Sequence, residues 1–201
     1  MFDKLLSGIS AGVLIAIGGS VFLAAPDKIT GSVFFCVALL SIYYKGYALF
    51  TGKVGYLPEK HDGEAVSVLL WGLVGNLIGT LAAGLLVRYA IPSIGEAAEA
   101  LCDGKLAAQT PLQTFIRAIF CGILMYLAVS IFRDAKTPVG ILFCIPTFIL
   151  AGFEHSIADM FYFFAAARFI PETALYLVLV VLGNAVGGVM LPIFNRVWRK
   201  K

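Results

Sequence analysis

Gly75-Asn76-Leu77-Ile78-Gly79 recurs in the chain as Gly183-Asn184-Ala185-Val186-Gly187. Each copy falls in the third apolar segment of its half, so the chain consists of two similar units of three segments. Because three is an odd number of crossings, the second unit enters a membrane from the opposite side, an arrangement common in transport proteins. The pattern therefore predicts one transmembrane domain over residues 1–201, built as an inverted 3+3 repeat of residues about 1–91 and about 112–201.

The composition is that of a membrane protein. Sixty per cent of the 201 residues are hydrophobic and 13% are charged, whereas soluble domains contain roughly 45–50% apolar residues. A membrane helix needs about 20 mostly apolar residues. Six segments meet this length, at about 5–25, 30–50, 65–90, 113–132, 138–167 and 173–195. The longest connection is a predicted loop from Pro92 to Pro111, which leaves too little chain for a receptor or a tethered soluble enzyme.

The lysines and arginines predict the orientation. Of 15 in total, five flank one side of the six segments: Lys28, Arg88, Lys105, Arg117 and Arg168. The other ten flank the side that holds both termini: Lys4, Lys45, Lys53, Lys60, Arg133, Lys136, Arg196, Arg199, Lys200 and Lys201. Flanking Lys and Arg resist translocation, so the richer side faces the cytoplasm. We expect a multi-pass protein of the cell membrane with both termini in the cytoplasm.

The second and fifth segments carry residues that interrupt a helix. Gly46 and then Phe50-Thr51-Gly52 fall in the second segment, and Gly152 followed by Glu154 and His155 falls in the fifth. Unwound backbone at membrane depth is tolerated where protein covers it or where it lines a polar cavity. We therefore expect two facing breaks that mark a pore or a binding site. The plainer interpretation of the glycines is that they let membrane helices pack closely.

Three ionisable residues, Glu154, His155 and Asp159, fall inside the fifth segment. A charged group in a membrane interior costs roughly 2.5–3.5 kcal/mol on insertion scales, which makes each a candidate for function. Histidine ordinarily titrates near pH ~6.5, so we expect His155 to exchange a proton with a small anion. The alternative is a core histidine bonded to a neighbouring helix. We expect the Glu154 carboxylate to hold the break together by accepting backbone N–H groups.

Two cations lie near segment ends. Lys45 either extends to the cytoplasmic interface or draws anions toward a pore mouth, and Arg117 has the same two interpretations. The four cysteines show no C-x-x-C spacing and are expected to be small buried hydrophobes. With His61 in a loop and no second cluster of ligands, we expect no metal site and no cofactor.

The fifth segment contains Ala151-Gly152-Phe153-Glu154-His155-Ser156-Ile157-Ala158-Asp159-Met160, which resembles the fifth-helix signature of the formate/nitrite transporter family almost position for position. Leu49-Phe50-Thr51 resembles the start of the Ω-loop in the family's second helix. The two Gly-Asn patterns resemble its third and sixth helices, and residues 115–129 resemble its fourth. The resemblance covers most of the chain in order, from the second helix to the sixth.

The resemblance implies an all-α, aquaporin-like protomer with six transmembrane helices, broken in helices 2 and 5, that assembles as a homopentamer. It would pass formate, nitrite, hydrosulfide or similar monovalent anions or their conjugate acids. Matched by position, His155 is the central pore histidine and Thr51 is its hydrogen-bonding partner. The resemblance also implies Leu39, Phe50, Phe148 and Phe35 at apolar constrictions and Lys105 as an attractor of anions. Further expected pore or substrate residues are Glu154, Asn76, Asn184 and Lys45, singled out from the residues themselves, and Gly122, where the chain departs from the family pattern.

The chain departs from the family pattern at three positions. Gly122 stands where asparagine is usual on helix 4, Ala48 where an acidic residue is usual, and Asp159 where asparagine is usual. Gly122 removes a hydrogen-bonding side chain near the pore centre, and Asp159 adds a carboxyl group close to His155. We expect a channel or proton-coupled carrier for anions of weak acids, and not an enzyme. The alternative is a neutral-solute pore of aquaporin or urea-channel type.

Overall fold

The structure, a computed structural model, describes the backbone of residues 1–198 and the side chains through Arg196. Three cations of the orientation count, Arg199, Lys200 and Lys201, lie outside the described residues. The elements within the described residues are α1 (Phe2–Ala24), α2 (Lys28–Lys45), α3 (Phe50–Lys53), the 3-10 helix η1 (Val54–Tyr56), α4 (Gly63–Ala90), α5 (Pro92–Ala108), α6 (Pro111–Ala135), α7 (Val139–Leu150), α8 (Ser156–Ala165) and α9 (Pro171–Trp198).

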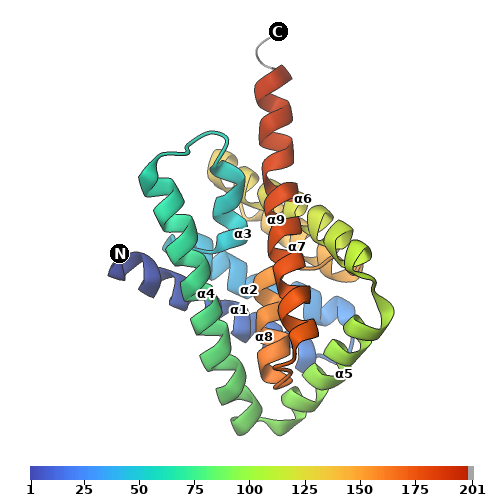
Figure 1. The fold of residues 1–201 in the computed structure, drawn as a ribbon. Coiled ribbons are helices and arrows are strands. Elements are labelled where there is room, and N and C mark those ends of the chain that lie inside the picture. Colours follow the sequence, from blue (N-terminus) through green and yellow to red (C-terminus); the bar gives the residue numbers. More distant parts are fainter. Residues whose placement is uncertain (199–201) are drawn as a thin grey trace.

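Five of these helices, α1, α2, α4, α6 and α9, are long and apolar enough to cross a membrane by length and composition. They coincide with five of the six segments expected from the sequence. The remaining segment, 138–167, is divided between two short apolar helices, α7 and α8. Both lie among the long helices in Figure 1. The chain is an all-helical membrane protein.

Both interruptions occur where the backbone takes a left-handed turn at a glycine. Gly46 follows α2 with a φ of 75°, and the chain becomes helical again at Phe50. Gly152 follows α7 with a φ of 72°, and α8 begins at Ser156. Glycine adopts positive φ without steric cost because it has no Cβ. The two glycines therefore end their helices within otherwise apolar sequence.

Asn76 of α4 holds the first break by three hydrogen bonds. Its side-chain oxygen accepts the Phe50 N–H at 2.9 Å. Its side-chain NH₂ donates to the carbonyls of Ala48 and Gly8, each at 2.9 Å. One buried amide thus provides hydrogen-bond partners for backbone groups at a helix N-terminus, in the chain leading into it and in the first helix of the unit. Buried backbone groups need such partners.

Asn184 of α9 holds the second break in the same way. Its side-chain oxygen accepts the Ser156 N–H at 2.8 Å. Its side-chain NH₂ donates to the carbonyls of Glu154 and Ala118, each at 2.8 Å. In each half the amide binds the first residue after the break, the residue two positions earlier and the first helix of the unit. The repeated Gly-Asn pattern is therefore also a repeated set of contacts.

The connection from Pro92 to Pro111 is not the loop expected from the sequence. It forms the 17-residue helix α5, which starts at Pro92, where a missing N–H is tolerated, and continues through residues of high helix propensity. The expectation was wrong because it relied on apolar length, and α5 is too polar and too short to meet that test. Figure 1 shows α5 between α4 and α6, and it packs against α8.

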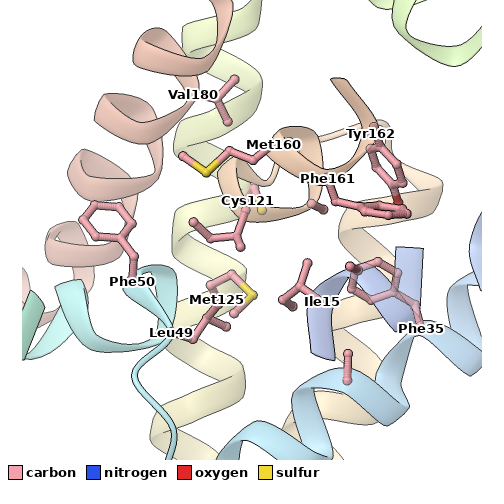
Figure 2. Close-up of a cluster of buried hydrophobic side chains, with 14 of the residues drawn as sticks. Ile15, Phe35, Leu49, Phe50, Cys121, Met125, Met160, Phe161, Tyr162 and Val180 are labelled. Atoms are coloured by element: carbon pink, nitrogen blue, oxygen red, sulfur yellow. The ribbon is translucent and has the colours of Figure 1, made fainter. Parts of the chain in front are cut away.

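Apolar side chains from both halves form one buried core. Figure 2 shows Leu49 and Phe50, beside the first break, in the same cluster as Met160 and Phe161 of α8. Met125 of α6 lies beside Leu49 in this view. In a bilayer such contacts stabilise through close packing rather than through removal from water. The core thereby holds the two interrupted segments against each other.

Candidate functional site

His155 and Thr51 meet where the two breaks face each other. Thr51 Oγ1 lies 2.9 Å from His155 Nε2, and both side chains are buried. The other ring nitrogen, Nδ1, accepts the Ala158 N–H at 3.1 Å. Because Nδ1 accepts, it carries no hydrogen in a neutral ring, so Nε2 carries the hydrogen and donates it to Thr51 Oγ1. The start of α8 thus fixes the tautomer and points one exchangeable proton at the opposite half.

One apolar ring stacks on this histidine, and a second ring packs against the first. Phe148 stacks on the His155 ring with centroids 5.5 Å apart and planes 15° apart. Phe35 meets Phe148 edge-on with centroids 6.5 Å apart. Leu39 and Phe50 are also buried. A charged solute that passes these apolar side chains therefore leaves water for hydrocarbon, and a hydrogen-bonding partner is needed to offset that cost.

A cavity of about 330 Å³ opens onto His155 from the side of α5 and α8. Its polar and charged lining consists of Lys28, Lys105, Gln109, Arg117, Glu154, His155 and Asp159. Arg117 donates to the Gly152 carbonyl at 3.4 Å, so its charge lies beside the second break. A water molecule takes about 30 Å³ of liquid, so the cavity has room for a small polyatomic solute together with several waters.

Lys105 extends from α5 into the wall of this cavity and pairs with two carboxylates. Its Nζ bonds Glu154 Oε2 and lies 3.1 Å from Asp159 Oδ1. Gln109 Nε2 donates to the other Glu154 oxygen at 2.7 Å. The expectation that the Glu154 carboxylate accepts backbone N–H groups is therefore wrong. Its side-chain partners come from α5 and the residue after it, a region that the sequence interpretation left as a loop.

Gln109 is a residue of the site that the sequence did not single out. Besides its bond to Glu154, its side-chain oxygen accepts the Thr114 hydroxyl at 3.1 Å and the Tyr176 hydroxyl at 3.5 Å. It directly precedes Thr110, whose capping box with Gln113 starts α6. That capping signal, visible in the sequence, locates Gln109 at a helix start close to the second break.

Lys45 lies away from this centre. It is the last residue of α2 and is exposed. It lines neither the cavity at His155 nor a second cavity of about 940 Å³, which lies toward the C-terminal ends of α6 and α9. Of the two interpretations of Lys45, this placement favours an interfacial lysine.

The described residues contain no group of three or more His, Cys, Asp and Glu side chains that could hold a metal ion. Cys36, Cys102 and Cys121 are buried free thiols, and Cys144 is partly buried.

Comparison with known proteins identifies the family. The model of the family described as Formate/nitrite transporter matches residues 1–198. This chain belongs to the formate/nitrite transporter family. The protein is therefore a membrane transporter or channel and not an enzyme.

Relatives of this family member span most of its length. The uncharacterized transporter YwcJ of Bacillus subtilis is 29% identical, over 92% of this chain and 84% of the relative. A probable formate transporter of Methanothermobacter thermautotrophicus is 27% identical, over 93% of this chain and 79% of the relative. The nitrite transporter NirC of Escherichia coli is 24% identical, over 90% and 74%.

Solved structures of the formate/nitrite transporter family have the same fold. A pentameric formate channel with formate bound matches with a TM-score of 0.79 and 25% identity, over 100% of this chain and 98% of that chain. An FNT family ion channel matches in fold with a TM-score of 0.74 and 21% identity, over 98% and 88%. The likeness extends over the whole helical arrangement rather than one repeat.

Gly122 in this member of the formate/nitrite transporter family leaves no room for the asparagine expected there. A Cβ atom added to Gly122 would lie 2.9 Å from the Gly188 nitrogen and closer still to the Asn184 carbonyl oxygen. Both are backbone atoms of α9, so they cannot move without separating α9 from α6. Glycine at this position therefore permits a close helix contact.

Replacing Gly122 with asparagine should destabilise the protein, by about 1–3 kcal/mol as for other overpacked positions. The measurement is the thermal unfolding midpoint of purified protein in detergent. Gly104→Asn is the matched control, because a Cβ at Gly104 meets nothing within 4 Å. Equal midpoints for the two variants would contradict the packing role of Gly122.

Proposed function

We propose that this protein is a transmembrane channel or transporter for small monovalent anions of weak acids, such as formate, nitrite or hydrosulfide, and that His155 shares a proton with the permeating anion. The observation that carries the proposal is the 2.9 Å hydrogen bond between His155 and Thr51, formed between two broken segments at a cavity that opens onto His155. The nitrite transporter and the formate channel among its relatives support this substrate class.

The apolar rings explain why a proton is needed. An ionised carboxylate loses several kcal/mol of hydration when it enters an apolar passage, and it avoids that cost by becoming neutral. In the cavity the anion takes the place of Thr51 as the acceptor of the His155 Nε2 proton. To donate that proton, His155 first takes a second proton at Nδ1 from water in the cavity, which breaks its bond to the Ala158 N–H, so that donation leaves a neutral ring. The uncharged acid then passes the ring of Phe148 and releases the proton in water on the far side.

The proposal includes a topology and an assembly. In it α7 and α8 together form the sixth crossing, and residues about 1–91 and 112–201 form an inverted repeat within one aquaporin-like domain of residues 1–201. The matching hydrogen bonds of Asn76 and Asn184 support the repeat. Both termini face the cytoplasm by the Lys and Arg count, and the protomers form a homopentamer in the cell membrane, as in the related formate channel.

Replacing His155 with asparagine should lower formate or nitrite uptake into proteoliposomes by about tenfold or more, since general acid catalysis contributes at least that much. In the wild type, uptake should rise as the pH falls, because a larger fraction of the imidazole is then protonated. The variant should lose this rise. Uptake of formate, acetate, lactate, nitrite and hydrosulfide is measured separately from pH 5 to pH 8.

The matched control is His61→Asn, which changes the other histidine of the chain, an exposed residue of the loop before α4. It should leave uptake and its pH dependence unchanged. A His155→Asn protein that keeps the wild-type pH profile would eliminate the proton-sharing role. A wild-type protein that takes up none of the five anions would eliminate the anion-transport function itself.

One observation favours the second candidate, a neutral-solute pore. Lys105, the expected attractor of anions, is already paired with the carboxylates of Glu154 and Asp159. Its charge is thereby offset within the cavity wall. Swelling of proteoliposomes in urea or glycerol without anion-dependent uptake would favour this candidate over the first.

A further inference from the structure

We propose that Asp159 is a second proton-exchanging residue for transport, which holds a proton at the cavity wall and donates it to the anion before the anion meets His155. This inference rests on the proposed function and deepens it.

A count of charges indicates that the cluster binds a proton. Lys105 supplies one positive charge, and Glu154 and Asp159 supply two carboxyl groups, with all three side chains largely buried. If both carboxyl groups are ionised, one negative charge remains uncompensated in a buried site. Buried charges without a partner are strongly disfavoured. A single bound proton makes the cluster neutral.

The hydrogen bonds indicate where that proton is held. Glu154 uses both side-chain oxygens as acceptors, one from Lys105 and one from Gln109. Asp159 uses Oδ1 for Lys105, whereas its buried Oδ2 has no hydrogen-bond partner among the described residues. Buried polar atoms are normally partnered. A proton on Oδ2 turns this oxygen into a donor. Because the oxygen itself is buried, the Asp159 carboxyl group must rotate to present this proton to an anion in the cavity that Asp159 lines.

The cavity that Asp159 lines also contains His155, Lys28 and Arg117, but among the described residues Lys105 is the cation within ion-pair distance of Asp159. Its ionisable neighbours are Lys105 and Cys102 on α5, Glu154 before α8, Tyr162 on α8, Cys121 on α6 and Tyr176 on α9. The ionisable side chains of α1 are Asp3 and Lys4, in its first turn. Arg88 of α4 pairs with Glu99 at 2.6 Å. Lys105 is therefore the cation that the two carboxyl groups share.

The step is a proton transfer without oxidation or reduction. The O–H bond at Asp159 Oδ2 breaks while an O–H bond forms on the anion, giving the neutral acid and an Asp159 carboxylate. The carboxylate then stays beside the Lys105 ammonium and takes a proton from water in the cavity. Asparagine holds no such proton, so it could only donate a hydrogen bond.

The test compares formate uptake into proteoliposomes between pH 5 and pH 8 for the wild type, Asp159→Asn and Asp159→Glu. The wild type should show two protonation steps in its pH profile. Asp159→Asn should lose one of them, with uptake at pH 5.5 reduced by about fivefold or more, and Asp159→Glu should restore both steps with a shifted midpoint. Asp103→Asn, an exposed carboxylate of α5 paired with Arg168, is the control and should match the wild type.

An infrared readout separates this inference from the proposed function. At pH 7 the wild type should show a carbonyl stretching band of a protonated carboxyl group, and that band should be absent from Asp159→Asn but present in Asp103→Asn. A missing band in the wild type, or a pH profile unchanged by Asp159→Asn, would overturn the inference. If Asp159→Asn fails to fold, the Asp159→Glu variant provides the test. A pH profile of uptake with the same midpoints as the wild type would then overturn the inference. A wild type that shows the band but transports no anion would support the protonated carboxyl group and contradict the proposed function.

Discussion

Replacing Lys105 with methionine should destabilise the protein by about 3–5 kcal/mol near pH 8, the cost typical of removing one partner from a buried ion pair. Methionine keeps most of the length of the side chain, so the loss comes from the missing charge rather than from a cavity. Lys105 is the cation that contacts both Glu154 and Asp159. Without it, the negative charge that remains on the two carboxyl groups has no cation beside it in a buried site.

The loss of stability in Lys105→Met should depend on pH. Protonation neutralises the carboxyl groups as the pH falls, so the deficit should be largest at pH 8 and smaller at pH 5. Thermal unfolding midpoints in detergent at both pH values measure the effect. The double variant Lys105→Met with Glu154→Gln should recover much of the stability at pH 8, because it removes the carboxylate that Lys105 no longer neutralises.

Lys60→Met is the matched control for this experiment, because Lys60 lies 3.6 Å from Asp62 in an exposed ion pair. Exposed pairs contribute about 0–1 kcal/mol, so this variant should unfold close to the wild type. If Lys105→Met unfolds at the same temperature as Lys60→Met at pH 8, the buried pair does not have the importance that its contacts indicate.

Replacing Asn184 with alanine should cost about 2–4 kcal/mol, because three hydrogen bonds disappear and the Ser156 N–H is left buried without an acceptor. It should also weaken transport, since α8 then loses the bond that fixes its first residue and, through it, the orientation of His155. Asn76→Ala should produce a comparable loss, because Asn76 makes the equivalent three bonds in the other half.

The control for both asparagines is Asn195→Ala, an exposed asparagine on the same helix as Asn184. It should leave the unfolding midpoint and the uptake rate close to those of the wild type. The measurements are the thermal midpoint in detergent and formate uptake into proteoliposomes. If Asn184→Ala retains the wild-type midpoint, the hydrogen bonds at the break are not what holds it.

Much of the fold could be predicted from the sequence because in a membrane both helix length and helix interruption leave clear signals. Apolar length located five long helices, and Gly46 and Gly152 ended helices at the two places where the backbone turns left-handed. The helix α5 was missed because it does not cross the apolar layer, and its signal is propensity rather than hydropathy. Its alanine-rich sequence after Pro92 contained that signal.

The site was only partly predictable. The Thr51 and His155 contact joins residues 104 positions apart, and no spacing rule within a helix reaches that far, so it followed from the family resemblance. The partners of the Glu154 carboxylate could not be read from spacing either, since Lys105 lies 49 positions away on a helix that the sequence analysis treated as a loop. Gly122 was interpreted as a lost amide, whereas it is a point of helix contact.

The two asparagine bonds also constrain how the protein is made. Asn76 is synthesised 26 residues after Phe50, and Asn184 is synthesised 28 residues after Ser156. At about 5–20 residues per second, a ribosome adds that length in roughly 1–6 s. During each interval an interrupted segment has left the ribosome without the side chain that satisfies its exposed backbone. Each unit can therefore complete its hydrogen bonds only after its third helix has been synthesised.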